Sequence, residues 1–258
     1  MALSSVALVV GHPGHELRLH RWIEIHRPLV FVLTDGGGHA ARPRIASTTR
    51  LIERTGATPA GGAFYGAFGD RELYDALLGA DDSRFVALAA HLAHRLDDAG
   101  CTTVAGDAAE GYNPGHDVCR ILIDAAVERR RRSGQPLLNL AFPLVAHPGA
   151  TFGGQPPAVA LELDAAALER KLAAARDYLE MQEEVERALA RYGAAAFATE
   201  ALWNVEPNRV ASSHDEAPFY ETHGSLRVRE GHYRETIRHH NHMLPVARAL
   251  RDWAAASP

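Results

Sequence analysis

Short continuous apolar runs alternate along the chain with longer segments whose apolar residues recur at helical spacing. The runs at residues 6–10 (VALVV) and 29–34 (LVFVLT) are rich in β-branched residues, and a glycine-containing turn follows each of them. Such runs are typical of strands that are buried on both faces of a parallel sheet. The same pattern predicts further strands at residues 102–105, 137–145 and 158–163.

The segments between these runs predict amphipathic helices. In segment 84–99, Phe85, Leu88 and Leu92 lie three or four positions apart, and Gly100 follows as a helix stop. Further helices are expected at residues 17–26, 44–54, 70–78, 118–127, 165–191 and 235–255, the last bent or broken near Pro245. Strands and helices that alternate at this spacing predict an α/β fold with a mostly parallel sheet and helices on both faces.

The composition fits this fold and excludes several classes of protein. The chain has 258 residues, of which 47% are hydrophobic and 23% charged, and its formal net charge is −5. This length suits one large α/β domain over residues 1–258, and no repeat or linker divides it. The slightly acidic balance offers no basic surface to nucleic acid. Two cysteines, no signal peptide and no apolar stretch of about 20 residues favour a cytoplasmic protein that does not enter membranes.

Three glycine-rich loops carry the candidate chemistry. They span residues 12–16 (HPGHE), 35–39 (DGGGH) and 107–117, and each follows a predicted strand. Because ligands bind beyond the carboxyl ends of parallel strands, we expect these loops to meet at one edge of the sheet. A lone histidine is more commonly a surface or hydrogen-bonding residue, but here two loops share the form [His/Asn]-Pro-Gly-His-[Glu/Asp].

Imidazole nitrogen is a preferred ligand of zinc and related divalent ions. His12 and His15 lie three positions apart in one tight loop, so both rings can reach a single ion. His116, at the start of the helix after the third predicted strand, would supply a third ligand. The sequence therefore predicts a centre of three histidines, with zinc as the expected metal and Fe(II) or another divalent transition metal as the alternative.

These motifs resemble the PIG-L/LmbE superfamily of zinc-dependent N-acetylglucosaminyl deacetylases, over about residues 5–190. The family's His-Pro-Asp-Asp-Glu loop stands here as His12-Pro-Gly-His-Glu16, and its His-Pro-Asp-His motif as Asn113-Pro-Gly-His116. Thr34-Asp35-Gly36 matches the family's Thr-Asp-Gly after the second strand. The resemblance implies a Rossmann-like fold and removal of an acyl group from an N-acyl amine, such as an N-acetyl sugar or a small metabolite. It leaves residues of about 200–258 as a cap or extension.

The family's metal ligands, a His, an Asp and a His, correspond to His12, His15 and His116. Two departures affect the mechanism that the resemblance implies. Gly14 stands where the family has the aspartate that acts as general base, and glycine accepts no proton. Asn113 stands where the family has an oxyanion-stabilising histidine, and it keeps a hydrogen-bond donor without the charge.

Two acidic residues are therefore candidates for the general base. Asp107 comes after the third strand and Glu110 lies in the loop that follows, where its glycine neighbour gives it freedom to move. The alternative role of Asp107 is to orient a ligand histidine. Tyr112, next to Asn113, is a candidate oxyanion donor.

Substrate contacts are assigned to Asp35, Arg50 and Glu16. Each has a structural alternative: Asp35 as a turn residue, Arg50 as an exposed helix residue, and Glu16 as a partner of a backbone amide or of a metal ligand.

Three functions stay open at this point. The first is a zinc-dependent amide hydrolase, resembling a deacetylase, that acts on a small-molecule substrate. The second keeps the metal but uses it for Fe(II) redox or lyase chemistry, because the family's base is missing. The third is a non-catalytic relative that only binds a ligand. Whether the chain forms a homo-oligomer is also left open.

Overall fold

The computed structural model describes residues 5–38, 42–147, 154–205 and 217–256. These residues form one sheet of eight strands with the order β3-β2-β1-β5-β6-β8-β7, and β4 pairs with β2 beside this path. The strands are β1 (Val6–Val10), β2 (Leu29–Thr34), β3 (Thr58–Pro59), β4 (Tyr65–Phe68), β5 (Thr103–Asp107), β6 (Leu138–Phe142), β7 (Val159–Glu162) and β8 (Thr199–Asn204). β1 pairs in parallel with both β2 and β5, and β5 pairs in parallel with β6.

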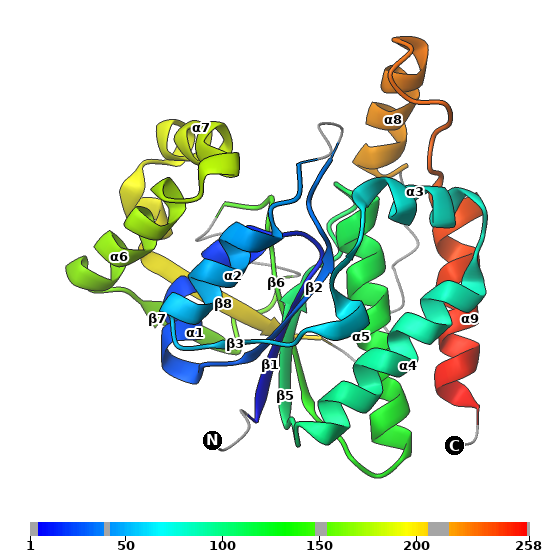
Figure 1. Cartoon of the computed structure of the whole chain (residues 1–258), viewed down its shortest axis with the longest axis horizontal. Helices are drawn as coiled ribbons and strands as arrows, with labels where there is room; N and C mark the ends of the chain where they lie inside the picture. Colours follow the sequence, from blue (N-terminus) through cyan, green and yellow to red (C-terminus); the bar gives the residue numbers. More distant parts are fainter. Residues whose placement is uncertain (1–4, 39–41, 148–153, 206–216, 257–258) are drawn as a thin grey trace.

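The helices cover both faces of this sheet, as Figure 1 shows. They are α1 (His20–His26), α2 (Ile45–Arg54), α3 (Asp70–Leu78), α4 (Asp82–Asp98), α5 (Pro114–Arg132), α6 (Ala165–Arg176), α7 (Gln182–Tyr192), α8 (Phe219–Arg229) and α9 (Leu244–Ala255). Short 3-10 segments lie at His15–Leu19, Gly62–Phe64, Leu179–Met181 and Ala194–Ala198.

Alternate side chains of the central strands enter two separate cores. Ala7 and Val9 pack with the apolar sides of α4, α5 and α9, whereas Leu8 and Val10 pack with α1 and α2. All four side chains are fully buried, which explains why β1 is a continuous apolar run. The predicted α/β fold, with a mostly parallel sheet and helices on both faces, is confirmed.

One edge of the sheet differs from the prediction. The predicted strand at 158–163 exists as β7, but it pairs antiparallel with β8, and β8 pairs antiparallel with β6. β8 is not predicted from the sequence, because its TEALWN segment has Glu200 and Asn204 among the apolar residues. The sheet is therefore mixed at this edge.

The single helix predicted for 165–191 is wrong. The chain breaks between α6 and α7, and Tyr178 in the break is only 2% exposed. Its ring packs against Leu17 and Leu51, and its hydroxyl lies 2.7 Å from Thr48 Oγ1. These contacts hold Tyr178 in the break between the two helices.

The largest shifts of helix starts from the predicted positions are those of α5 and α9. α5 starts at Pro114, four residues before the predicted start, and Asn113 caps it. α9 has Pro245 in its first turn, where proline needs no hydrogen-bond partner. A short π-helical segment, His239–Met243, precedes α9 in place of the predicted helix start at residue 235.

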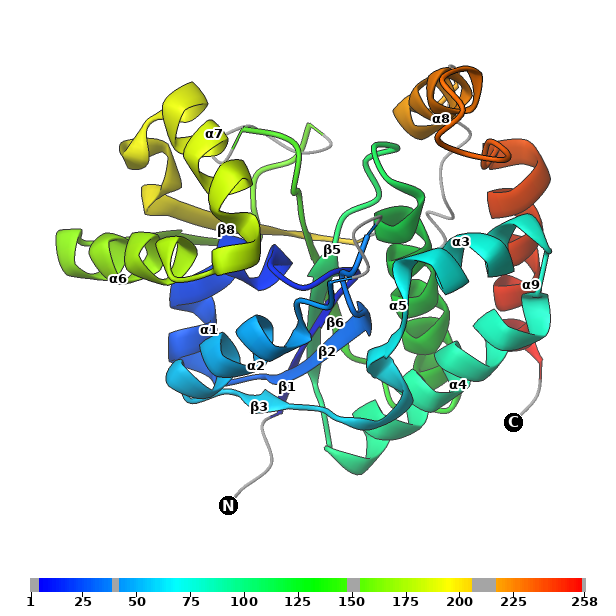
Figure 2. The same cartoon turned by 45° about the horizontal axis from the view of Figure 1, so that its top comes forward.

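The region after residue 200 is not simply a cap. β8 belongs to the sheet, and Val246 and Leu250 of α9 belong to the same core as α4 and α5. Figures 1 and 2 show α8 and α7 on opposite sides of the sheet edge at which the parallel strands end, and Tyr220 of α8 belongs to the same core as α4 and α5.

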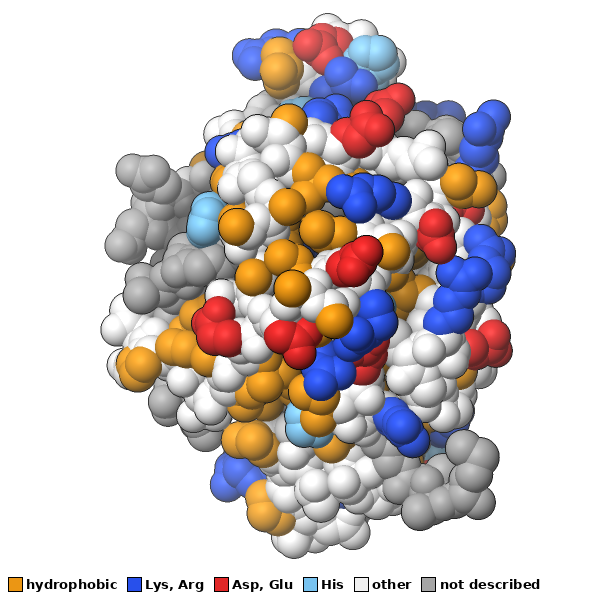
Figure 3. Space-filling view, turned by 90° about the vertical axis from the view of Figure 1, so that its left-hand side faces the viewer, with side chains coloured by type: hydrophobic (Ala, Val, Ile, Leu, Met, Phe, Trp, Pro, Cys, Tyr) orange, Lys and Arg blue, Asp and Glu red, His pale blue; other side chains and the backbone are white. Residues whose placement is uncertain are grey.

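Figure 3 shows the side of the molecule on which α6 and α7 lie, where apolar side chains sit between charged ones of both signs. Among the helices of the described residues, none combines the length and the apolar character needed to cross a membrane.

Candidate metal centre

The side chains of His12, His15 and His116 converge beyond the carboxyl ends of β1 and β5. Each offers one nitrogen, and these three atoms lie within 4.8 Å of one another. The ring centroids are 5.3 Å apart for His12 and His15, 5.2 Å for His12 and His116, and 4.5 Å for His15 and His116. β1 has β2 on one side and β5 on the other, so the histidines lie where the strand order reverses, the usual ligand position of such sheets.

The first loop is held in shape by Glu16. Its fully buried carboxylate accepts the backbone N–H of Gly14 at 2.8 Å and the hydroxyl of Thr48 at 2.7 Å. Burial raises the pKa of Glu16 to about 7. The sequence assigns Glu16 to substrate binding, but a carboxylate buried and bonded in this way anchors the loop instead.

Gly14 has a backbone conformation that glycine favours, with φ of +103°. A Cβ atom at this position would lie 2.0 Å from Sδ of Met181, which comes from the break between α6 and α7. The space that the family's aspartate would need is therefore filled by Met181.

Asp107 orients His15. Its Oδ2 atom lies 2.7 Å from His15 Nδ1 and accepts the backbone N–H of Gly11, also at 2.7 Å. Asp107 is the last residue of β5 and is fully buried. Since Nδ1 of His15 is engaged, its Nε2 is the atom left for a metal. Of the two roles considered for Asp107, the geometry supports the orienting one rather than the general base.

Burial keeps the three imidazoles neutral. It is the main cause that lowers the pKa of His12 to about 4 and of His15 to about 3, and it brings the pKa of His116 well below its ordinary value. A neutral imidazole is the form that binds a metal. Three neutral imidazoles that each offer a nitrogen within 4.8 Å of the others form a donor set that fits a metal ion.

The second motif begins α5. Asn113 caps the helix by accepting the backbone N–H of Gly115 at 2.7 Å, and Pro114 takes the first helical position. A Cβ atom at Gly115 would lie 2.5 Å from Cε1 of His12, so this glycine makes room for the ring. Asp117 accepts the backbone N–H groups of two residues in the preceding loop.

Glu110 is not free to move, contrary to the expectation from the sequence. Its carboxylate accepts backbone N–H groups from three consecutive residues after β6: Leu144, Val145 and Ala146, at 2.6 to 3.1 Å. A carboxylate bonded in this way is unsuited to act as a general base. Tyr112 is 45% exposed, and its ring stacks on that of Phe219 in α8, with centroids 4.8 Å apart.

The contacts of the other predicted substrate residues are local. Asp35 accepts the backbone N–H of Gly37 at 2.8 Å, which is the turn role considered above. Arg50 is exposed on α2 and donates to Ser47 Oγ at 2.8 Å. His39, in the same loop as Asp35, lies outside the described residues.

Two charged residues near the histidines, Asp70 and Arg44, are not predicted from the sequence. Asp70, the first residue of α3, has its Oδ1 atom 3.8 Å from Nε2 of His12. Arg44 precedes α2, and its charge is the second cause, after burial, that lowers the pKa of His15. Asp70 follows β4, a four-residue strand that contains a glycine. This segment lacks the apolar pattern of a strand, so a functional loop after it could not be predicted.

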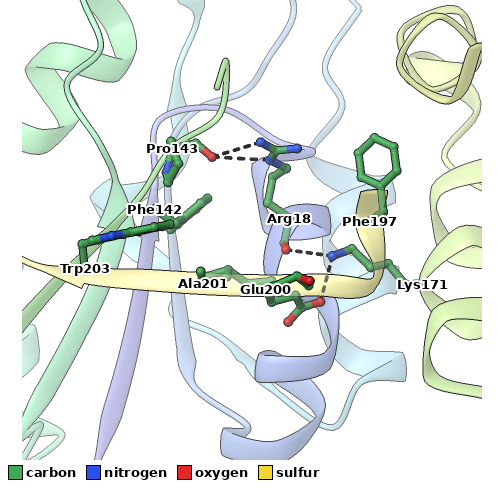
Figure 4. Close-up of a pocket in the computed structure, with 10 residues that line it drawn as sticks. Arg18, Phe142, Pro143, Lys171, Phe197, Glu200, Ala201 and Trp203 are labelled. Carbon is green, nitrogen blue, oxygen red and sulfur yellow. Dashed lines mark hydrogen bonds and ion pairs between the residues drawn. The ribbon is translucent and has the colours of Figure 1, made fainter. Parts of the chain in front are cut away.

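A small cavity lies elsewhere, between β8, α6 and the segment that precedes α1 (Figure 4). Its volume of about 20 Å³ suits a single water rather than a substrate. Its charged groups are already paired: Lys171 donates to Glu200 at 2.9 Å and to the backbone oxygen of Arg18 at 3.0 Å. We therefore take the histidine cluster as the candidate functional site.

Neither a family model nor a curated protein matches the sequence. Among solved structures, the chain is similar to the crystal structure of the conserved protein TT1542 from Thermus thermophilus, with 16% identity and a TM-score of 0.47. The match covers 79% of this chain and 95% of that chain. Likeness at this level leaves the function to be argued from the site itself.

Proposed function

We propose that the protein is a metal-dependent hydrolase that removes an acyl group from a small N-acyl amine, with His12, His15 and His116 as the ligands of a zinc ion. The observation that carries the proposal is the convergence of three neutral imidazoles, one of them oriented by a buried carboxylate. Three histidines and one open position form a known catalytic arrangement for zinc.

A zinc ion in such a site polarises a carbonyl oxygen and makes water more acidic. The residues of the chain do the rest. Asp107 fixes the ring of His15, Glu16 fixes the loop between the two first ligands, and Gly115 leaves space for the ring of His12. The choice of an N-acyl amine as substrate is supported by the resemblance of the two histidine loops to those of the deacetylases.

The proposal includes a reducing compartment, the cytoplasm. The chain has only two cysteines, Cys101 and Cys119, and both are buried, as is usual for proteins of compartments where disulfides do not form. Cell fractionation of the native host would test this assignment, and recovery in a secreted fraction would contradict it.

The first experiment is elemental analysis of protein that is purified without added metal or chelator. We expect about one zinc per chain in the wild type and a loss of zinc in His15→Ala. His94→Ala is the matched control, because His94 lies on α4 with a side chain that is 72% exposed. Circular dichroism should show the same fold in all three proteins.

The second experiment measures release of acetate from a panel of N-acetylated amines and amino sugars. Zinc-dependent release should be lost in His12→Ala and His116→Ala, while both variants stay folded. Activity equal to that of the wild type in these variants would overturn the proposed hydrolase function. About one iron per chain would instead favour redox chemistry and lead to oxygen-consumption assays, and a protein without metal would end the proposal.

A further inference from the structure

The carboxylate of Asp70 is turned toward the histidine cluster with one oxygen unused. Its side chain is 10% exposed, and Oδ1 lies 3.8 Å from Nε2 of His12. This oxygen is buried and accepts no hydrogen bond from the described part of the chain. A buried oxygen without a donor is costly, and the cost is removed when a bound molecule donates to it.

The rest of Asp70 is held firmly. Its other oxygen, Oδ2, accepts the backbone N–H of Gly38 at 2.8 Å. Asp70 opens α3, where the helix dipole stabilises a negative charge. One turn later, Tyr74 donates to Asn113 Oδ1 at 3.3 Å, which ties the same face of α3 to the start of α5. The free oxygen is therefore fixed in position rather than carried on a mobile side chain.

The other acidic residues near the cluster are committed to the protein. Glu16 and Glu110 are bonded to backbone amides of the loops that they hold. Asp107 also keeps an oxygen without a partner, but its side chain is completely buried and its other oxygen is the one engaged with His15. Asp70 differs from all three because an oxygen of a partly accessible carboxylate remains free beside a ligand.

We infer that Asp70 is the acid–base residue of this site, an inference that rests on the proposed hydrolysis. Asp70 Oδ1 takes a proton from the attacking water while the water oxygen bonds to the carbonyl carbon of the substrate. It then gives this proton to the amine nitrogen as the carbon–nitrogen bond breaks. The products are a carboxylic acid and a free amine, so water is the sole co-reactant. Asp70 thus supplies, from the end of another strand, the function that glycine at position 14 cannot perform.

The test compares zinc-loaded wild type with Asp70→Asn, which keeps the size of the side chain and removes its basicity. The matched control is Asp75→Asn, on the same helix with a side chain that is 69% exposed. Acetohydroxamate is the probe, because it binds zinc while its acidic hydroxyl proton needs a neighbouring acceptor. A hydrogen bond to a charged group is worth enough that its loss should weaken acetohydroxamate binding about tenfold or more in Asp70→Asn. Calorimetry measures this affinity.

Zinc content and turnover complete the test. Asp70→Asn should keep one zinc per chain and lower kcat for 4-nitroacetanilide by about 10²-fold to 10⁴-fold with little change in KM, as expected for the loss of a general base. Unchanged acetohydroxamate affinity in Asp70→Asn would overturn the inference and leave the hydrolase standing. Loss of zinc in this variant would also overturn it, because Asp70 would then support the metal itself. Failure of the wild type to hold zinc would overturn the proposed function first.

Discussion

Nδ1 of His15 lies 2.7 Å from Oδ2 of Asp107, and the two residues belong to neighbouring parallel strands of the sheet and the loops that follow them. Asp107 ends β5, whereas His15 lies in the loop that follows β1. The same carboxylate oxygen also accepts the backbone N–H of Gly11. The orientation of one ligand is therefore set by the pairing of two strands rather than by its own loop.

Asp107→Asn should weaken zinc binding without unfolding the protein. An amide oxygen bears no charge, so its bonds to His15 and to the N–H of Gly11 become weaker, and the ring is less firmly oriented. Changes to such partners of metal ligands lower affinity by about 10-fold to 100-fold. Competition with a chromophoric chelator measures the affinity, with Asp98→Asn on the exposed side of α4 as the control. Equal zinc affinity in Asp107→Asn and the wild type would contradict the role that we assign.

Gly115→Ala should separate helix stability from metal binding. Alanine favours a helix over glycine by about 1 kcal/mol, yet its Cβ would lie 2.5 Å from Cε1 of His12 and force the ring to move. We expect zinc affinity to fall about tenfold or more while the metal-free variant still folds.

The control for this variant is Gly224→Ala in α8, where the nearest atom to the added Cβ is a side-chain methyl of Thr236 at 3.1 Å. This second variant should bind zinc like the wild type. If Gly115→Ala also bound zinc normally, the close approach of the His12 ring would have no functional meaning.

Gly14→Asp should not recreate the motif of the deacetylases. The new side chain would start 2.0 Å from Sδ of Met181 and from a backbone with φ of +103°. Strain of this kind costs roughly 1–3 kcal/mol of unfolding free energy. Met181→Ala in the same chain should recover part of the loss, because the collision disappears but the backbone strain remains.

A double-mutant cycle in urea measures this coupling between positions 14 and 181. We expect the loss in the double variant to be smaller than the sum of the two single losses. Strictly additive losses would show that Met181 does not limit what position 14 can hold.

The stability of the metal-free protein should depend on pH through Glu16. Burial raises the pKa of Glu16 in the folded state from its ordinary 4.5 to about 7. The folded state then binds this proton more tightly than the unfolded state, so the contribution of Glu16 to stability falls as the pH rises from about 4.5 to 7. The difference between the pKa values of Glu16 in the two states corresponds to about 3 kcal/mol of unfolding free energy.

Glu16→Gln removes this ionisation. Urea unfolding of chelator-treated protein measures this effect. The free energy of unfolding of the variant, relative to that of the wild type, should increase across the same pH range and stay constant above it. A constant difference between the two proteins at all pH values would contradict the predicted pKa.

The sequence predicts the centre of the fold because the physical signals there are local. β1 and β2 are continuous apolar runs as a result of burial on both faces, and Gly100 ends a helix in a conformation that glycine favours. The three histidine positions follow from the same logic, since the ends of adjacent parallel strands must meet.

The remainder depends on contacts that no local pattern records. Asp70 reaches the histidines only because β4 pairs beside β2, and Glu110 is immobilised by a loop more than thirty residues later in the chain. Tyr178, in the break between α6 and α7, packs against side chains of two other segments. Such contacts can be identified only from the tertiary structure.

The packing of Met181 on Gly14 also constrains how this sequence can change over evolutionary time. A side chain at position 14 and a long side chain at position 181 compete for the same space, because a Cβ atom at 14 would lie 2.0 Å from Sδ of Met181. A substitution at position 14 should therefore cost less in a chain that already has a small residue at 181. The order in which two such substitutions arise then changes the stability of the intermediate protein, although the final sequence is the same.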